Sequence, residues 1–387
     1  MSFSDRDALL AAITADPDED TPRLVYADWL SEHGEDDHAE LIRSQCRLEH
    51  VSRRTAEGKR LAAREKELCT KLFGHLDTLG FSEVNFRRGF VAQVTSGALD
   101  FHAHAAALTA EIAPAFGLKL EESARDKDMR DDDYEAHDAM FGAAADRAET
   151  RRCVSLDLPC IGMAAMHQLL SAPQWVNLRR LNAPQSEAGP SFYQLNSPTF
   201  ANLRWLNISE SNSAGGDARI WGFTDNTHLA NLEYLDFRSN LLEGDDAHRL
   251  NESRCLTNLR VLYASGGSYL NGGTVSWLLF RGRGLPRLQE LSLSHEFPDL
   301  EDFYFDIDDD SGHGLDDRSP PLLTRLSKLR LQHNQITDAG AEVLARYPRA
   351  VNLTLLDLTG NPIGADGRRA LIERFGPGVC VFEGGDR

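Results

Sequence analysis

The hydrophobic residues in the C-terminal part of the chain recur in a fixed arrangement. LSKLRLQHNQI begins at Leu326 and LTLLDLTGNPI begins at Leu353, and both carry leucine at positions one, four and six, 27 residues apart. The same LxxLxL arrangement can be followed backwards through units that begin at Leu288, Leu259, Leu232 and Leu203 and, in a degraded form, at Leu178, Cys153 and Ala115. Most intervals are 25 to 29 residues. Such a period predicts a solenoid of stacked units.

Each unit predicts one short strand. Because side chains alternate along a strand, positions four and six of the unit point into the solenoid, and positions three and five point to the opposite, solvent-facing side. An asparagine follows the strand in three units (Asn240, Asn334 and Asn361). We expect it to bond backbone groups of neighbouring coils, which is a structural role.

The segments between the strands predict helices. Residues 338–347 and 365–375 each place apolar side chains on one helix face, Gly376 stands where a C-cap glycine belongs, and residues 163–170 offer a third copy. From about residue 115 to 383 the chain resembles the ribonuclease-inhibitor-like class of leucine-rich repeats. This resemblance implies an α/β fold, a leucine-rich-repeat solenoid with parallel strands on the concave side and helices on the convex side.

Residues 1–85 have a different pattern, which predicts an all-helical module. Four helices are expected between residues 5 and 78, with Thr21 as the N-cap of the second. The string PRLVYADWLSEHGEDDHAELIRSQCRL is similar to the bacterial repeat-companion domain, a helical module that often precedes leucine-rich repeats in bacterial proteins. The resemblance implies a capping role for the module and brings no known reaction with it.

Three residues of this module, Tyr26, Asp28 and Trp29, stand out in its second helix. Aromatic residues at helical spacing usually belong to the core, so Tyr26 and Trp29 are expected to pack the helices together. Asp28 is expected to bond locally or to pair with Arg23. The following RRGFVAQVT looks like the strand that joins the module to the repeats in that family, so residues 86–114 are expected to form a connecting strand and helix.

Two intervals in the repeat region are about ten residues longer than their neighbours and predict long loops at residues 123–152 and 296–321. Loops of this length on a rigid scaffold often serve binding, and simple tolerance to insertion is an equal alternative. The second loop is strongly acidic and includes Asp306, Asp308, Asp309 and Asp310. It departs from a calcium-binding loop in the place of its glycine and in its twelfth residue, so a dedicated metal site is not expected.

The composition narrows the classes of partner. A formal net charge of −19 disfavours binding to nucleic acid and to anionic membranes, and it suits either a basic protein partner or plain solubility. The six cysteines are far apart and form no CxxC pair, which argues against a metal cluster or a disulfide framework. The chain starts without a basic segment followed by an apolar one, and its apolar runs are too short to cross a membrane. We therefore expect a cytoplasmic protein.

The solvent-facing strand positions supply the candidate binding site. Trp205, Tyr234 and Tyr263 come from three successive units and should form one aromatic patch. The other residues assigned to this partner-binding face are polar: Arg180, Asn207, Asp236 and Arg330. Exposed aromatic residues beside arginine are typical of binding hot spots. The alternative is that the rings only stabilise adjacent strands by stacking.

No sequence motif of an enzyme is present. GxSxG, HExxH, P-loop and GxGxxG sequences are absent, so neither catalytic residues nor a cofactor are expected. The sequence thus predicts a non-enzymatic scaffold that binds a protein partner through the concave face of the solenoid and the acidic loop. The alternative is a regulator of a partner enzyme, because the long repeats and the acidity resemble GTPase-activating proteins of the Ran class. A ubiquitin-ligase effector would need a further catalytic domain, and the chain ends at Arg387, directly after the last unit.

Overall fold

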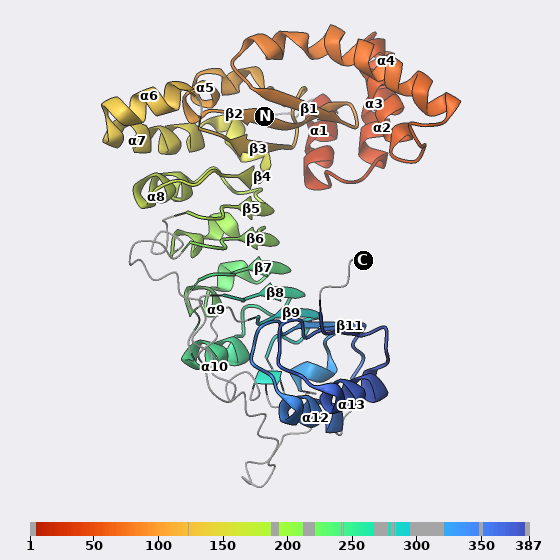
Figure 1. The fold of residues 1–387 in the computed structure, drawn as a ribbon. Coiled ribbons are helices and arrows are strands. Elements are labelled where there is room, and N and C mark those ends of the chain that lie inside the picture. Colours follow the sequence, from red (N-terminus) through yellow and green to blue (C-terminus); the bar gives the residue numbers. More distant parts are fainter. Residues whose placement is uncertain are drawn as a thin grey trace. The chain divides into compact units, whose positions relative to one another are not determined.

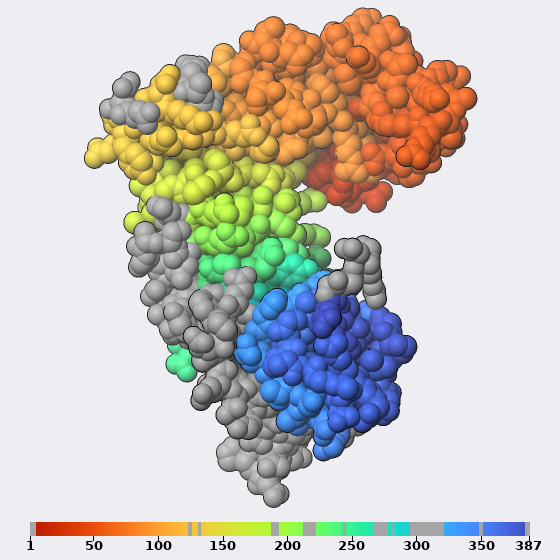
Figure 2. All heavy atoms as spheres, in the orientation of Figure 1, coloured from red at the N-terminus to blue at the C-terminus, as the bar shows by residue number. Residues whose placement is uncertain are grey.

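The computed structural model divides the chain into two compact units. The first unit comprises Met1–Pro159 and Ala164–Leu181, and the second unit comprises Cys160–Met163 and Asn182–Arg387. The residues that the structure describes, which are coloured in Figure 1 and Figure 2, are 5–122, 124–186, 193–211, 221–240, 242, 244–266, 278–279, 282, 284–294, 321–347 and 351–383. Strands follow one another in sequence order: β1 to β4 belong to the first unit, the boundary between the units falls within β5, and β6 to β12 belong to the second unit.

Four helices begin the first unit. They are α1 (Asp5–Ala15), α2 (Thr21–Glu32), α3 (Asp36–Leu48) and α4 (Ala56–Phe73). Pro22 lies in the first turn of α2, where its missing N–H costs no hydrogen bond. The Thr55 hydroxyl caps α4 by accepting a hydrogen bond from the N–H of Gly58 at 3.0 Å. The short helix η1 (Gly74–Thr78) follows α4 directly.

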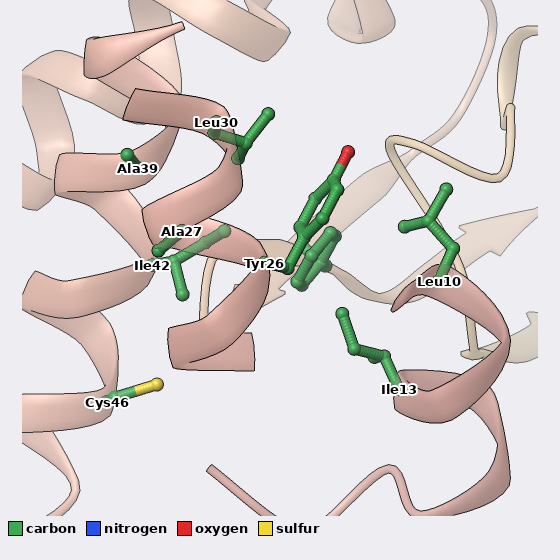
Figure 3. Packing of buried hydrophobic residues seen from close by; sticks show 9 residues of the cluster. Leu10, Ile13, Tyr26, Ala27, Leu30, Ala39, Ile42 and Cys46 are labelled. Carbon is green, nitrogen blue, oxygen red and sulfur yellow. The ribbon is translucent and has the colours of Figure 1, made fainter. Parts of the chain in front are cut away.

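Tyr26 lies in the core between these helices. Figure 3 shows its ring between Leu10 and Ile13 of α1 on one side and Ile42 of α3 on the other. The side chain is fully buried, and Trp29 stacks against it with 5.9 Å between ring centroids. The expectation that the two aromatic residues pack the helices together is confirmed.

A β-hairpin that the sequence pattern did not predict follows the helices. β1 (Glu83–Arg87) pairs antiparallel with β2 (Phe90–Ser96), so strand structure starts inside the segment expected to be all-helical. Phe86 of β1 stacks on Phe73 of α4, with 5.1 Å between ring centroids. β2 pairs on its other side with β3 (Phe116–Leu120) in parallel. The hairpin therefore satisfies both edges of β2 and joins the helices to the parallel strands.

The rest of the first unit alternates strands and helices. β3 is followed by β4 (Cys153–Asp157) and β5 (Arg180–Asn182), and the connecting helices are α5 (Ala98–His104), η2 (Ala105–Ala107) and α8 (Met163–Ser171). The strand and helix expected in residues 86–114 correspond to β2 and α5, and the helix expected at residues 163–170 corresponds to α8.

Residues 123–152, expected to form a loop, contain helices instead. They hold α6 (Ala124–Asp132), α7 (Tyr134–Ala145) and the short η3 (Ala148–Arg152). Asp133 caps α7 by accepting a hydrogen bond from the N–H of Ala136 at 3.0 Å, and Phe141 is buried. His102 of α5 lies 3.0 Å from the carbonyl of Ala143, which ties α7 to α5. The sequence pattern did not predict these helices, because the many charged residues of the segment obscure the helical spacing of its few apolar residues.

The second unit continues the parallel arrangement. Its strands are β6 (Trp205–Asn207), β7 (Tyr234–Asp236), β8 (Val261–Tyr263), β9 (Glu290–Ser292), β10 (Lys328–Arg330), β11 (Leu355–Asp357) and β12 (Cys380–Val381). The described helical segments of this unit are η5 (Pro198–Phe200), which precedes β6, and α9 (Trp221–Thr224), η7 (Thr227–Leu229), α10 (Gly244–Glu252), η8 (Leu322–Thr324), α12 (Asp338–Arg346) and α13 (Ala365–Phe375), which lie between the strands. Figure 1 shows α12 and α13 side by side. The expected helices near residues 338–347 and 365–375 are confirmed.

One leucine from each of the strands β6 to β11 forms a continuous core. The register aligns Leu206, Leu235, Leu262, Leu291, Leu329 and Leu356 across six strands. All six are 0% exposed. The predicted register, with position four of each unit facing inward, is therefore confirmed.

The asparagines after the strands bond the backbone of neighbouring coils, as predicted. Asn361 donates to the carbonyls of Leu331 and Leu358, each at 2.8 Å, and its Oδ1 accepts from the N–H groups of Asn334 and Ile336 at 2.9 and 3.0 Å. Equivalent bonds run from Asn240 to Ile208 and from Asn334 to Leu293. These side chains satisfy buried backbone groups where the chain leaves each strand.

Candidate functional site

Three aromatic residues from adjacent strands of the second unit lie in contact. Trp205 of β6 and Tyr234 of β7 are paired in register, and their rings stack with 4.8 Å between centroids and 8° between planes. Tyr263 of β8 meets Tyr234 edge to face, with 5.6 Å between centroids. All three are half-buried. The aromatic patch that the sequence predicted, Trp205, Tyr234 and Tyr263, is therefore one continuous surface.

Glu290 of β9 holds the outer end of this patch in place. Its carboxylate is almost buried and accepts a hydrogen bond from the Tyr263 hydroxyl at 2.5 Å and one from Lys328 Nζ at 3.1 Å. Arg330 of β10 donates to the same carboxylate, and its guanidinium carbon lies 5.6 Å from the Tyr263 ring centroid. Tyr263 is thus held by the hydrogen bond of its hydroxyl to Glu290 and by the cation of Arg330 next to its ring.

This network changes the ionisation of its members. Burial by itself would raise the pKa of Glu290, but hydrogen bonds from Tyr263, Arg330 and Lys328 outweigh burial and lower that pKa. Burial first, and then the hydrogen bond to Glu290, raise the pKa of Tyr263. For Arg330 burial works against the charged form, and the bond to Glu290 outweighs it and raises the pKa. The carboxylate and the guanidinium are therefore both charged at neutral pH.

Asp236, expected on the solvent-facing side of β7, is covered by Arg238. The Arg238 guanidinium donates to both carboxylate oxygens, from Nε to Oδ1 at 2.9 Å and from Nη2 to Oδ2 at 2.6 Å. The Asp236 residue is only 1% exposed as a result. At this point the solvent-facing side of the strand therefore presents the Arg238 cation and not the Asp236 carboxylate. Position five of the unit does face this side, but the neighbouring residue two places along decides what is presented.

A cavity of about 540 Å³ opens beside Tyr263. Its lining residues come from positions five, seven and eight of successive units: Tyr263, Ser292, Arg330, Arg238, Ser265, Ser294, Gln332, Thr359 and His333. Arg238 and Arg330 place their guanidinium carbons 5.5 and 5.6 Å from the Tyr263 ring centroid. The cavity therefore presents two cations, one aromatic ring and several hydroxyls.

The hydroxyls in the cavity are linked to one another. Ser265 and Ser292 lie 2.7 Å apart through their Oγ atoms, and Ser265 also accepts from the N–H of Ser294 at 3.0 Å. Gln332 donates from Nε2 to Asp357 Oδ2 at 2.9 Å. Neighbouring repeats are therefore joined by side-chain bonds along this line as well as by strand pairing.

Most lining residues were missed by the sequence analysis, although a signal for them exists. Arg238, Ser265, Ser294, Gln332 and Thr359 all occupy position seven of the repeat unit. The alternation that assigns positions three and five to the solvent-facing side extends one step further, past the end of the strand. Reading the pattern to position seven would have identified this row.

The remaining predicted site residues lie apart from the cavity. Asn207 donates to Asn182 Oδ1 at 2.8 Å and accepts from the N–H of Ser209 at 3.0 Å, so it supports the strand ends. Arg180 belongs to the first unit, where its guanidinium lies 3.7 Å from the Asp157 carboxylate. The predicted acidic loop, with Asp306, Asp308, Asp309 and Asp310, lies outside the described residues.

Within the part of the chain that the structure describes, no group of three or more histidine, cysteine or acidic side chains has an arrangement that could hold a metal ion. Among the described helices, none is long and apolar enough to span a membrane.

Comparison with known proteins identifies the repeats. A family model described as leucine-rich repeat matches residues 324–345 and 350–371. The chain carries leucine-rich repeats. The first matched repeat contains β10 and most of α12, and the second contains β11 and the first part of α13, so each leucine-rich repeat supplies one strand and one helix.

Two solved structures are similar to the chain. A crystal structure of a protein from Bacteroides fragilis shares 13% sequence identity over 65% of this chain and 71% of that chain, with a TM-score of 0.41. A crystal structure of the Rad7 and Elc1 complex in yeast shares 12% identity over 98% of each chain, with a TM-score of 0.37. No curated protein matches the sequence significantly.

Proposed function

We propose that this leucine-rich-repeat chain is a non-enzymatic scaffold that binds a protein partner through the strand face of its second unit. One observation carries the proposal: the aromatic patch of Trp205, Tyr234 and Tyr263 is continuous with the cavity that Arg238 and Arg330 border. Tryptophan, tyrosine and arginine are the residues most enriched in binding hot spots. A row of repeats exposes such residues on one extended surface without any catalytic group.

The arrangement is fixed before a partner arrives. Tyr263 is held by Glu290, and Arg238 is held by Asp236, so neither side chain has to be ordered on binding. Side chains that are already immobilised lose less conformational entropy when a complex forms. This supports a binding role over a purely structural one, because stacking between strands alone does not require a bordering cavity.

The same groups define the chemistry that fits the cavity. Asp236 and Glu290 lie beneath the surface, whereas Arg238 and Arg330 line the cavity together with hydroxyl groups. A partner segment that enters it should carry hydrogen-bond acceptors, such as carboxylate or amide oxygens. Outside the segment that enters the cavity, the partner should be basic, because this chain has a net charge of −19.

We also propose that the helices in residues 1–85 form a bacterial repeat-companion module that caps ribonuclease-inhibitor-like repeats in a cytoplasmic protein. The α1 helix contacts the segment before β3, where Thr14 Oγ1 donates to the Pro114 carbonyl at 2.8 Å. The hairpin continues into the parallel strands through β2 and β3. A terminal coil exposes an apolar end that requires such a cover. The six free cysteines suit a reducing compartment.

The binding proposal can be tested by affinity capture with matched variants. Tyr234→Ala removes the central ring of the patch, and Arg369→Ala changes an exposed residue on α13, outside the strand face. Wild type and Arg369→Ala should capture the same partner from a cell extract, and Tyr234→Ala should capture several-fold less of it. Melting curves establish that both variants are folded. Equal capture by all three proteins would show that the binding surface lies elsewhere.

A further inference from the structure

The first unit contains a second cavity, of about 250 Å³, that the binding proposal does not use. It lies at the starting ends of the parallel strands, next to the turn between α1 and α2. One part of its lining is apolar: Pro17, Phe90, Val91, Ala92, Ala115 and Val154. The other part is charged: Asp18, Arg23, Arg87, Arg88 and Arg179. Four arginines and one aspartate therefore face the same small space.

Arg23 is the most unusual of these residues. It is 5% exposed, and its guanidinium lies 5.9 Å from the Phe90 ring centroid. Nη1 donates to the Glu19 carbonyl at 2.9 Å, but Nε has no hydrogen-bond partner among the described residues. Arg23 also forms no ion pair with any described carboxylate. A buried cation that no described carboxylate contacts directly is costly, so an anion bound in the cavity would stabilise it.

The carboxylate expected to pair with Arg23 is engaged elsewhere. Asp28 accepts a hydrogen bond from Arg43 Nη2 at 2.7 Å and points into solvent, with 74% of its side chain exposed. The sequence-based expectation that Asp28 bonds locally or pairs with Arg23 is therefore wrong, because its partner comes from α3. Two residues five places apart on one helix lie on different faces, and only the face of Arg23 meets the cavity.

Arg88 brings a second buried guanidinium to the cavity. It is 9% exposed, and its backbone has a positive φ of 51°, which a residue other than glycine rarely adopts. Nε lies 2.9 Å from Asp20 Oδ1 without hydrogen-bond geometry, and Nη1 lacks a hydrogen-bond partner among the described residues. Arg88 and Gly89 form the two-residue loop of the hairpin, which requires a positive φ at both positions. The turn thus holds a partly unsatisfied cation against the cavity.

The charges around the two buried guanidinium groups are unbalanced on the cavity side. Asp20 and Glu49 lie near Arg88 and Arg87 but do not line the cavity, and Asp18, which does, has 80% of its side chain exposed. Burial and then the nearby charge of Arg88 lower the pKa of Arg23, and the charges of Asp20 and Asp18 offset this only in part. Within the described residues, the cavity is therefore a site where positive charge is crowded and an incoming anion relieves it.

We propose that this cavity binds the oxyanion group, carboxylate or phosphoryl, of a small ligand. The guanidinium groups of Arg23 and Arg88 donate to the oxyanion from the buried side, and Arg179 closes the site from the strand side. Guanidinium groups match such oxygens well because their donors lie in one plane. The apolar wall formed by Phe90, Val91 and Val154 accommodates the carbon part of the ligand.

Calorimetric titration of the full chain tests the proposal with two probes, inorganic phosphate and hexanoate, at constant ionic strength set with sodium chloride. The wild type should bind at least one probe. Arg23→Met should weaken binding about tenfold or more, because it removes a charge-assisted bond. Arg43→Met, an equal loss of charge in the same helical module, should bind like the wild type. Arg179→Met, on the other side of the cavity, serves as a second variant if Arg23→Met does not fold.

Each outcome has a defined meaning. Binding of phosphate alone assigns a phosphoryl ligand, and binding of hexanoate alone assigns a carboxylate with an apolar tail. If neither probe binds, or if Arg23→Met and Arg179→Met both bind like the wild type, the proposal is wrong and the arginines serve only the fold.

Discussion

Trp205 and Tyr234 stack face to face across two neighbouring strands, with 4.8 Å between their ring centroids. Leu206, the next residue, points to the other side of the same strand and is completely buried. Two consecutive residues thus belong to different surfaces of the repeat, one available to a partner and one in the core.

Replacing these neighbours should produce opposite effects. Trp205→Ala should lower the free energy of unfolding by only about 1 kcal/mol, the contribution of one aromatic pair, and should weaken partner binding by about 2 kcal/mol or more. Leu206→Ala should lower the free energy of unfolding by about 2 to 5 kcal/mol because it creates a cavity. Chemical denaturation and a binding assay on both variants measure the contrast. A Trp205→Ala variant that loses much of its stability but keeps its affinity for the partner would show that Trp205 belongs to the core, and that the two faces are assigned the wrong way round.

Glu290 should make the stability of the second unit depend on pH. Its pKa is lowered in the folded protein, so its stabilising effect is present above the ordinary glutamate pKa and is lost as the pH falls through the folded-state pKa. Glu290→Gln should therefore lower the free energy of unfolding at pH 7, by about 1 to 3 kcal/mol, and the difference from the wild type should shrink in acid.

Denaturation curves between pH 7 and pH 3 provide the measurement for Glu290. Glu342→Gln, which changes a carboxylate on α12 that pairs with Arg346 at 2.7 Å, is the control. Surface pairs of this kind contribute little, so this variant should differ from the wild type by less than about 1 kcal/mol. A pH-independent loss for Glu290→Gln would mean that packing, and not the charge, is responsible.

The Asn361 amide should contribute more to stability than an asparagine at the surface. Asn361→Ala leaves two buried N–H groups and two buried carbonyls without their partner, and should cost about 2 kcal/mol or more. Asn231 makes one exposed bond, to the Ala201 carbonyl at 2.8 Å, so Asn231→Ala should cost less than about 1 kcal/mol. Equal melting temperatures for the two variants would contradict the role assigned to the asparagine row.

Gly34 and Gly89 of the first unit have similar backbone angles but different surroundings, so alanine variants of the two distinguish the cost of backbone strain from the cost of a steric clash. Gly34 has a φ of 80° and open space where a Cβ would lie, whereas Gly89 has a φ of 87° and Ile42 atoms at 2.1 to 2.9 Å. Gly34→Ala should cost about 1 kcal/mol through the left-handed conformation. Gly89→Ala should cost at least about 2 kcal/mol more, because the methyl group displaces α3 from the hairpin.

Thermal unfolding of the two glycine variants checks this difference. Gly89 also donates its N–H to Gln45 Oε1 at 2.5 Å, and its carbonyl lies 2.9 Å from His38 Nε2, so a shift of the hairpin would disturb both bonds. If the two variants melt at the same temperature, the hairpin is free to move away from α3.

The sequence by itself determined the repeat, its register and much of its local structure. The spacing of leucines identified which residues fill the core, the asparagines were assigned their bonds, and Gly376 was placed at the end of α13, where it has a positive φ of 98°. These features depend on backbone periodicity and on local turn geometry, which a short stretch of sequence contains. The contact among Trp205, Tyr234 and Tyr263 also followed, because a fixed interval puts equivalent positions on adjacent strands.

Only the tertiary structure decided how charged side chains are shared between elements. Glu290 is bound by three side chains from the two neighbouring strands, and Asp28 pairs with Arg43 of another helix rather than with Arg23. Each pairing depends on which side chain of another strand or helix lies within hydrogen-bond distance of the carboxylate, and on how far water is excluded there. The cavity around Arg23 likewise combines segments that are more than 150 residues apart in the chain, from Pro17 to Arg179. The periodicity of the sequence does not predict these contacts, because they depend on how different elements pack against one another and not on the spacing of residues within one element.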